Sequence, residues 1–240
     1  DRIWSPRSTK VTMKKFDHSE LLESKELKRG LFEGRRLYSV GENRYPSVTT
    51  VLSNRKKKKE AIAKWRNRVG AEVANRTSTR AATRGTNFHG IVEQYVRNQL
   101  NLEDHKNSPL PVQMFHTSKS VIDRIDRPRL IESMLWSDKL KIAGQVDLIA
   151  EFDGVLSVID FKTSKSPKKP YIAQDYFPQL CAYGYMFYEH YKIEVEKLIA
   201  IVACEDGECQ VVETSVKEPH FVKLLEAIKE YEMTNALTTT

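Results

Sequence analysis

Asp160 and Lys162 stand two residues apart at the end of the hydrophobic stretch VIDFKTSK, residues 158–165. In a β-strand, residues at that spacing point to the same face. A carboxylate and an ammonium group placed side by side can form an ordinary ion pair at the surface. They can also belong to a metal-dependent site that attacks phosphodiesters. The residues around them have to distinguish these two interpretations.

A turn upstream gives Asp160 a partner. Two runs rich in β-branched residues flank Asp153-Gly154, and this dipeptide is one of the strongest hairpin signals. If these two residues form the loop, counting back along the strand places Asp147 directly opposite Asp160. Directly opposed residues share a face of the sheet and have Cβ atoms about 4.5–5.5 Å apart. The sequence therefore predicts two carboxylates and one ammonium group on one face of a hairpin.

Two facing carboxylates repel each other and lower stability unless a positive charge compensates them. A divalent cation would do so, and Mg²⁺ suits a site of one or two carboxylates plus a substrate phosphate. Lys162 could orient an attacking water or help to deprotonate it, and could offset charge on the phosphate. The alternative is a solvated hairpin end at which Lys162 simply neutralises the two acids.

A pair of helices upstream could contribute further ligands. Apolar residues at three- and four-residue spacing predict a helix over residues 60–82, a break at 83–86 and a second helix over 87–100. His89 would lie in the first turn of the second helix, with Glu93 one turn later on the same face. A neutral imidazole beside carboxylates is a familiar metal ligand, although a lone histidine is more often structural.

A later helix, expected over residues 174–190, would present Tyr176, Gln179 and Tyr183 on one side. A purely amphipathic helix would place an apolar residue at position 179. We therefore expect Gln179 to point to a site or to a phosphate. Between the hairpin and this helix, Lys165 and two further lysines add positive charge.

The elements that must position these residues suggest one α/β domain. Residues 1–40 are polar and irregular, and we interpret them as an N-terminal arm or peripheral layer. Residues 41–240 would then form a single domain. Within it, residues 45–53 could be a short strand or the entry to a helix, residues 101–111 read as a loop, and residues 112–142 as strands.

The charge of the chain favours a polyanionic partner but does not require one. Its 240 residues carry a formal net charge of +7, with an isoelectric point near 9.2. A charge of this size also serves solubility. The run from Arg55 to Lys59 contains five consecutive cations. It could be a solvated face or could follow the phosphates of a nucleic acid.

Cysteine content and hydrophobicity exclude several classes of protein. The three cysteines, Cys181, Cys204 and Cys209, are odd in number and lack metal-ligand spacing. They argue against a disulfide framework and against a zinc site. No apolar stretch approaches the ~20 residues that span a bilayer. We therefore expect no membrane partner.

Four motifs follow one another along residues 84–183, namely RGTNFH, GQVDLI, VIDFKTSK and QLCAY, and PSVTTVL precedes them at 46–52. In this order they resemble the RecB-like branch of the PD-(D/E)XK nuclease superfamily. The resemblance implies an α/β fold with a restriction-endonuclease-like core, in which helices flank a central mixed β-sheet. It also implies a divalent metal, Mg²⁺ or plausibly Mn²⁺. It implies no iron–sulfur cluster here, because three cysteines cannot supply the four ligands that some relatives use.

The resemblance further implies a role for each matching residue. Asp147, Asp160 and Lys162 match the catalytic positions. Both aspartates, with His89 and the backbone carbonyl of Phe161, match the metal ligands. The residues that would support the site or contact substrate are Glu93, Gln179, Tyr183, Lys165 and Arg84.

The implied activity is metal-dependent exonucleolytic hydrolysis of phosphodiester bonds in single-stranded DNA. Within its branch the chain is similar to exonucleases that process DNA ends or flaps in mitochondrial DNA replication, repair and maintenance. This similarity implies a monomer in the mitochondrial matrix, with a possible functional link to the replication machinery. Two alternatives remain, a structure-specific DNA endonuclease with the same core and a non-catalytic nucleic-acid-binding module.

Overall fold

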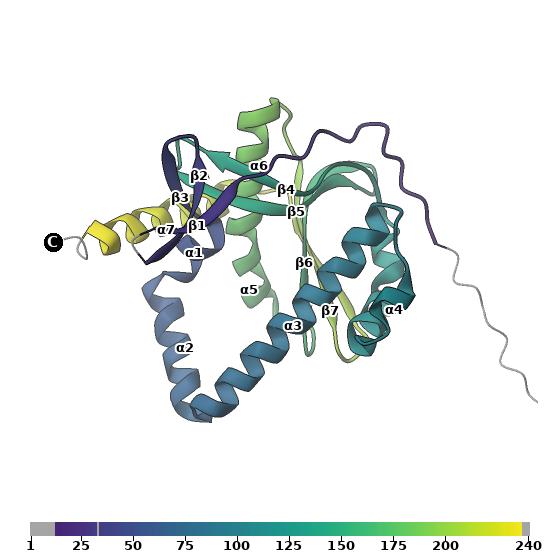
Figure 1. Ribbon diagram of the computed structural model, residues 1–240, viewed down its shortest axis with the longest axis horizontal. Helices are drawn as coiled ribbons and strands as arrows, with labels where there is room; N and C mark the ends of the chain where they lie inside the picture. Colours follow the sequence, from purple (N-terminus) through teal and green to yellow (C-terminus); the bar gives the residue numbers. More distant parts are fainter. Residues whose placement is uncertain (1–12, 33, 237–240) are drawn as a thin grey trace, which may run out of the picture.

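A five-stranded mixed sheet forms the centre of the computed structural model, which describes residues 13–32 and 34–236 (Figure 1). The spatial order of the strands is β4-β5-β6-β7-β8. Only β6 and β7 pair in parallel, and the other neighbours are antiparallel. The strands are β4 (Ile125–Ser137), β5 (Ile142–Phe152), β6 (Val155–Ser164), β7 (Lys197–Cys204) and β8 (Cys209–Thr214).

The β5–β6 hairpin has the predicted turn and register. Asp153 and Gly154 both adopt positive φ, at 51° and 79°, as a two-residue type I′ turn requires. Beyond the turn the pairing runs without a shift to Leu148 and Ile159. The register counted from the turn is therefore confirmed as far as Leu148 and Ile159, which are the chain neighbours of Asp147 and Asp160.

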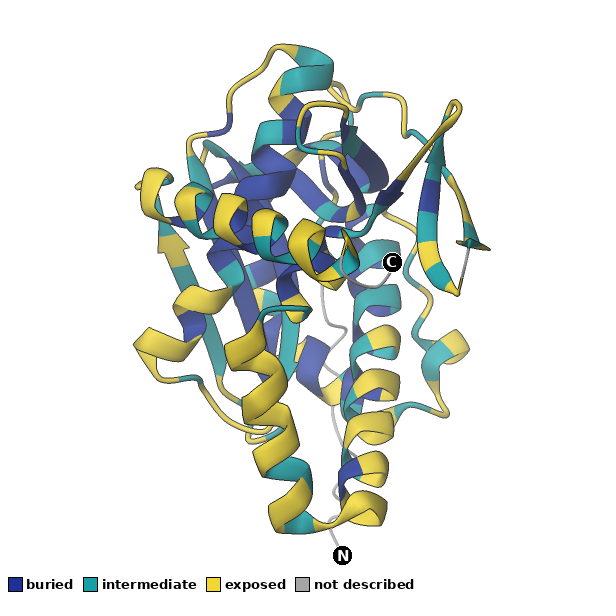
Figure 2. Cartoon of the chain, turned by 90° about the vertical axis from the view of Figure 1, so that its left-hand side faces the viewer, coloured by how far each residue is buried: buried dark blue, intermediate teal, exposed yellow. Residues whose placement is uncertain are grey.

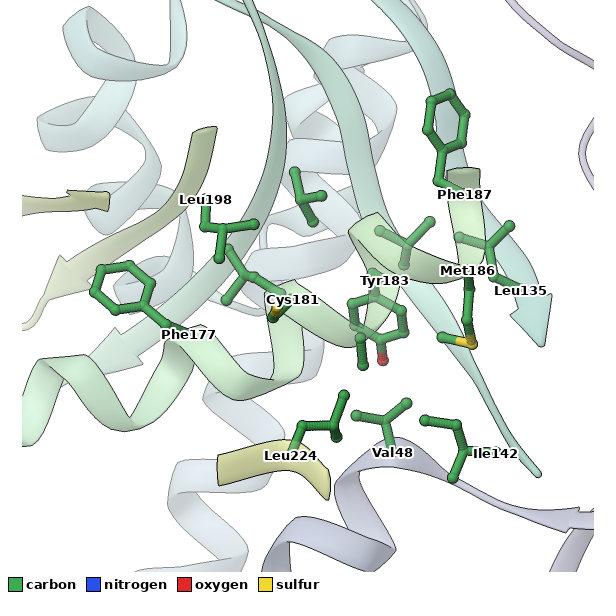
Figure 3. Packing of buried hydrophobic residues seen from close by; sticks show 14 of the residues in the cluster. Val48, Leu135, Ile142, Phe177, Cys181, Tyr183, Met186, Phe187, Leu198 and Leu224 are labelled. Carbon is green, nitrogen blue, oxygen red and sulfur yellow. The ribbon is translucent and has the colours of Figure 1, made fainter. Parts of the chain in front are cut away.

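Helices cover both faces of the sheet and enclose two hydrophobic cores, because successive strand residues point to opposite faces. On one face lie α3 (Ala71–Val96) and α4 (Pro109–Ile122). On the other lie α1 (Val48–Ser53), α6 (Phe177–Tyr191) and α7 (Glu218–Ala236). Figure 3 shows side chains of α6 packed close to Val48 of α1 and Leu224 of α7. The expected mixed sheet flanked by helices is confirmed.

The prediction of two helices broken at residues 83–86 was wrong. The structure has α2 (Lys56–Val69) and a continuous α3, and the break falls at Gly70. Gly70 takes a φ of 85°, a left-handed conformation that glycine adopts without a Cβ penalty. Tertiary contacts of Arg84 hold the helix together through residues 83–86. His89 consequently lies well inside a long helix, not in a first turn.

The hairpin of α2 and the outer half of α3 extends away from the body. No residue of α2 is buried, and most residues of α3 before Arg84 are exposed. Figure 2 shows these two helices as a mostly exposed projection at the lower end of the molecule. An amphipathic helix normally buries one face, so this projection is not held in place by a core of its own.

Residues 109–122, which were expected to include strand, form α4 instead. Pro109 begins the helix at a position where its missing N–H is tolerated. Met114, Ser118 and Ile122 recur at four-residue spacing on its buried side. Short connections complete this part of the chain as the 3₁₀ helices η1 (Leu102–His105) and η2 (Gln174–Tyr176), and the single turn α5 (Pro170–Ala173).

The N-terminal region packs along the body. Phe16 is buried, and its N–H donates to Asn98 Oδ1 at 2.9 Å. Farther along, the Leu22 N–H donates to the Arg129 carbonyl on β4 at 2.8 Å. Residues 28–40, expected to be irregular, contain strands of a small antiparallel sheet formed by β1 (Lys28–Phe32), β2 (Arg35–Val40) and β3 (Asn43–Pro46). Residues 1–12 of the expected arm lie outside the described part of the chain.

Both readings of residues 45–53 hold, one after the other. The segment ends β3 and then begins α1, with Ser47 as the N-cap between them. The Ser47 hydroxyl accepts a hydrogen bond from the Thr50 N–H at 3.0 Å, which satisfies one of the free donors of the first turn. This arrangement brings Ser47 and Thr49 to the edge of the cavity described next.

Candidate active site

Asp147 and Asp160 lie where the β5–β6 ladder ends. The last backbone pair is Leu148 with Ile159, and beyond it the Phe161 N–H donates to Asp147 Oδ2 at 2.9 Å. The aspartate side chain therefore replaces a backbone carbonyl as the acceptor at this level of the hairpin. This bond fixes one carboxylate oxygen of Asp147 close to the backbone that carries Asp160.

The two carboxylates are buried together. Asp160 is 2% exposed, and the Asp147 side chain is 13% exposed. Burial and the negative charge of Asp160 raise the pKa of Asp147, while His89 and Lys162 act in the opposite direction, and the resulting pKa is about 6. Asp160 Oδ2 accepts no hydrogen bond of good geometry from the described residues, and its close neighbour is the Lys162 ammonium at 2.7 Å. A buried carboxylate oxygen in this state is suited to a cation.

Lys162 supplies the positive charge of the site. Its Nζ lies 2.7 Å from Asp160 Oδ2 and donates a hydrogen bond to Gln179 Oε1 at 3.3 Å. Burial lowers the pKa of Lys162, but Asp160 and Asp147 outweigh this effect and the pKa is raised overall. Its Nζ also lies 5.8 Å from the centre of the Tyr176 ring. Lys162 thus carries its charge at neutral pH in this state.

His89 reaches the carboxylates from α3. Its Nδ1 lies 3.5 Å from Asp147 Oδ2, and its ring meets Phe161 edge-on, with centroids 6.4 Å apart. The side chain is 30% exposed, so it borders the cavity without being sealed in the core. Phe161 itself is buried, and its side chain belongs to the core under α3.

Helix α6 lines the opposite side with Gln179 and Tyr183, as expected for that helix. Tyr183 is buried, and burial is the main reason that its pKa is raised. A Cβ at Gly144 would lie 3.0 Å from the Tyr183 ring, closer than real Cβ contacts normally come. The glycine of GQVDLI therefore lets Tyr183 pack against β5 just before Asp147.

Glu132 is a member of this group that the sequence did not reveal. It lies in β4 between Ile131, which pairs with Leu148, and Ser133, which pairs with Val146, and so stands level with Asp147. Its φ is 47°, a left-handed conformation that costs of order 1–3 kcal/mol in a non-glycine residue. Such strain persists only where surrounding structure enforces it, and it is commonest at functional sites.

The side chain of Glu132 also faces the site. One ligand atom each from His89, Glu132 and Asp147 lie within 4.8 Å of one another. Burial is the main reason that the pKa of Glu132 is raised to about 8, and the charges of Asp147 and Glu93 contribute to this rise. The sequence places Glu132 as one polar residue in an alternating strand, which is typical of a solvent-facing position. The pairing of β4 with β5 places it beside Asp147.

These residues line one cavity of ≈ 590 Å³. Its carboxylates are hard oxygen donors, which fit a Mg²⁺ or Mn²⁺ ion, and its imidazole adds a borderline nitrogen donor. The lining residues that carry chemistry are His89, Glu93, Glu132, Asp147, Asp160, Lys162, Gln179 and Tyr183.

Three expected site residues are engaged elsewhere, at least in part. Glu93 lines the cavity but accepts a hydrogen bond from Arg97 Nε at 2.9 Å. Arg84 is buried, donates to Thr163 Oγ1 at 3.1 Å and forms an ion pair with Glu205. Arg84 and Lys165 line a neighbouring groove instead of the cavity of the two aspartates.

The basic run is partly desolvated at Lys58. Partial desolvation lowers the pKa of Lys58, as do the positive charges of Arg55 and, more weakly, Lys162, while Asp175 raises it. None of the described helices is long and apolar enough to cross a membrane.

Comparison with known proteins places these features in a family. Residues 104–236 match the family described as the PD-(D/E)XK nuclease superfamily. The chain is 28% identical over 190 residues to mitochondrial genome maintenance exonuclease 1 of Mus musculus, covering 75% of this chain and 54% of that protein. The Homo sapiens protein of the same name is 27% identical over 190 residues, covering 75% and 53%. The chain thus spans about half the length of these relatives.

Among solved structures, the chain is similar to a putative exonuclease from Eubacterium rectale. The TM-score is 0.42 and the sequence identity is 13%, over 64% of this chain and 66% of that one.

Proposed function

Because this chain belongs to the PD-(D/E)XK nuclease superfamily, we propose that it hydrolyses phosphodiester bonds of single-stranded DNA from a free end, with a divalent metal ion. The observation that carries the proposal is the pairing of two buried carboxylates, Asp147 and Asp160, beside the Lys162 ammonium in one cavity. A binding module without catalysis has no need to bury two like charges together, since this lowers stability.

Asp147, Asp160 and His89 would hold the metal, with the Phe161 carbonyl as a further ligand and Glu132 within reach of the same group. Mg²⁺ is the proposed ion, and Mn²⁺ would fit the same donors. When bound, it would polarise the scissile phosphate and neutralise the facing carboxylates. The His89 imidazole, with Nδ1 at 3.5 Å from Asp147 Oδ2, supports this assignment.

Lys162 would act on the phosphate as a positioned charge. Asp160 and Gln179 hold its Nζ from two sides, so the ammonium group is oriented before substrate arrives. A cation fixed in a largely buried site stabilises the negative charge that develops during phosphoryl transfer. Its raised pKa in the metal-free protein favours this role over that of a base that removes a proton from water.

The basic helices near the cavity support a single-stranded polyanion as substrate. The run from Arg55 to Lys59 leads into α2, and no residue of α2 is buried in the core. Cations along a groove follow the backbone of a single strand without reading its sequence. A passage too narrow for a duplex would require a free end, which is the proposed reason for exonuclease behaviour.

The relatives named mitochondrial genome maintenance exonuclease 1 support a biological setting. We propose that the protein is a monomer of the mitochondrial matrix that processes DNA ends or flaps during replication, repair and maintenance of mitochondrial DNA. A functional link to the replication machinery is part of the same proposal.

The test is incubation with linear and circular single strands of identical sequence, and with a blunt duplex, in Mg²⁺ and in EDTA. We expect digestion of the linear strand in Mg²⁺ only, with the circle and the duplex intact. Cleavage of the circle would favour a structure-specific endonuclease with the same core. Binding of the strands without cleavage of any would favour a nucleic-acid-binding module.

A further inference from the structure

A second groove begins where the active-site cavity ends. It has a volume of ≈ 460 Å³ and lies between the outer half of α3 and the segment after β6. Five cations and one carboxylate are among the residues that line it, an excess of positive charge without counterpart in the cavity of the aspartates. The charged residues are Arg76, Arg80, Arg84, Lys165, Lys168 and Glu205.

The groove and the active-site cavity adjoin along two elements. On β6, Lys162 lines the cavity and the next residue, Thr163, lines the groove. On α3, Arg84 lines the groove and the next residue, Gly85, lines the cavity. The two elements touch here, since a Cβ at Gly85 would lie 3.7 Å from Thr163 Oγ1. The groove thus starts one residue beyond the proposed catalytic lysine.

The floor of the groove is rigidly built. Arg84 is 8% exposed, donates to Thr163 Oγ1 and pairs with Glu205, whose own N–H donates to the Ser164 carbonyl at 3.0 Å. The segment after β6 is held at Lys168, where Gln210 makes hydrogen bonds of 2.8 Å to both the N–H and the carbonyl. The backbone under the lysines is therefore fixed before any ligand binds.

The outer cations face solvent above this floor. The Arg80 side chain is 68% exposed and lies 3.9 Å from Glu205, which already pairs closely with Arg84. Arg76 and Arg80 precede Arg84 by two turns and one turn of the helix, so these three residues form a row with steps of about 6 Å. A row suits the repeating phosphates of a strand, whereas a single terminal phosphate would need a ring of donors.

We propose that this groove binds the internal phosphodiester backbone of the DNA strand next to the bond being cut. The proposal rests on the proposed function and adds to it a second contact region with named residues. Lys165, Lys168, Arg80 and Arg76 contact the phosphates, and Arg84 positions the groove by tying α3 to β6 and to Glu205. Through these contacts the groove sets the register of the strand in the adjoining cavity.

The experiment measures DNA binding as a function of salt in the Lys162→Ala background, where the strand would stay intact. The groove variant carries Lys165→Gln and Lys168→Gln. The control carries Lys139→Gln and Lys229→Gln, two exposed lysines outside both cavities, so that the net charge is equal. For single strands, each phosphate contact adds about 0.7 to the slope of log K against log salt. We expect the groove variant to lower this slope by about 1.4 and the control to leave it unchanged.

Oligothymidylates with a terminal phosphate or a terminal hydroxyl distinguish binding to internal phosphates from binding to a terminal phosphate. Equal weakening of both by the groove variant supports binding to internal phosphates. Weakening confined to the phosphorylated strand, or equal slopes for the groove and control variants, would overturn the proposal. If the background protein binds no strand and the wild type cleaves none, the proposed function fails as well. If the wild type cleaves linear strands while groove and control variants behave alike, only the groove assignment fails.

Discussion

The two ends of the β5–β6 hairpin carry the same residue type in opposite electrostatic settings. At the turn, Asp153 accepts a hydrogen bond from Arg124 Nε at 3.1 Å, and this bond is the main reason that its pKa is lowered. At the other end, Asp147 is buried beside Asp160, and its pKa is raised to about 6. Negative charge is stabilised at the turn and destabilised at the site.

The difference separates acids that stabilise the fold from acids that serve a site. Glu151, near the turn, has Arg129 within 3.6 Å, so the acids of that end are matched by arginines. At the site, Lys162 contacts Asp160 directly and lowers the pKa of Asp147 through its charge, whereas the cation that acts on Glu132 is Arg97. The proposed metal site would use acids that arginines do not match, at one end of an otherwise well-paired hairpin.

The largest expected effect comes from Lys162→Ala. Removing a preoriented charge from the reacting phosphate should lower kcat for linear single-stranded DNA by about 10²–10³-fold or more, with Kd for the strand changed much less. Single-turnover kinetics and fluorescence anisotropy measure the two quantities. Arg124→Gln at the turn end is the matched control and should retain activity. Full activity of Lys162→Ala would contradict the assignment of this cavity as the active site.

Asp147→Asn should stabilise the metal-free protein, whereas most substitutions in a protein core lower the free energy of unfolding. In EDTA, loss of a repelled buried charge should raise the free energy of unfolding by on the order of 1–3 kcal/mol. In the wild type, Mg²⁺ at a hundredfold excess over its Kd should add about 2.7 kcal/mol, and the variant should lose most of this gain. Urea titrations with and without Mg²⁺ test both effects. A variant that is less stable in EDTA and still stabilised by Mg²⁺ would contradict the comparison.

The pH dependence of the metal-free protein sharpens the same contrast. Asp147 and Glu132 have pKa values of about 6 and 8, above the ordinary 3.8 and 4.5, so the folded state binds protons that the unfolded state has released. Their contribution to stability is therefore complete below about pH 4 and is lost as the pH rises through 6 and then 8. Thermal melts in EDTA should fall across this window. Glu132→Gln should flatten the upper part, and an unchanged upper limb would show that Glu132 does not face the site.

The smallest effect belongs to the turn end. Asp153→Asn removes a partly exposed ion pair with Arg124, whose side chains are 51% and 42% exposed, and should lower stability by about 0.2–1 kcal/mol. The loss should appear above the lowered pKa of Asp153 and vanish in acid, because the Asp153 carboxyl is then protonated in both the folded and the unfolded state. Chemical denaturation at neutral and acidic pH measures the change. Greater stability of the variant would show that negative charge is unfavourable at the turn as well as at the site, and would contradict the comparison.

Local signals explain why the hairpin was predictable from the sequence. The Asp153-Gly154 turn fixes the register of both strands by itself, so the position of Asp147 relative to Asp160 follows from counting. The spacing of Gln179 and Tyr183 on a helix is equally local.

Residues that depend on distant contacts were not predictable. The sequence around Arg84 and Gly85 suggests a break, yet Arg84 reaches Glu205, 121 positions away, and α3 continues. Glu132 stands level with Asp147 only through the pairing of β4 with β5, and no local pattern signals its positive φ. In each case the deciding interaction joins elements that the chain brings together only on folding.

The most direct test of the central claim is anomalous diffraction from crystals of the protein soaked in Mn²⁺. We predict one or two strong anomalous peaks within coordination distance of Asp147 and Asp160, with His89 among the ligands, and no peak at the turn end near Asp153. Crystals of Asp147→Asn should lack the peak. A fully occupied Mn²⁺ site elsewhere, with none between the two buried aspartates, would contradict the account.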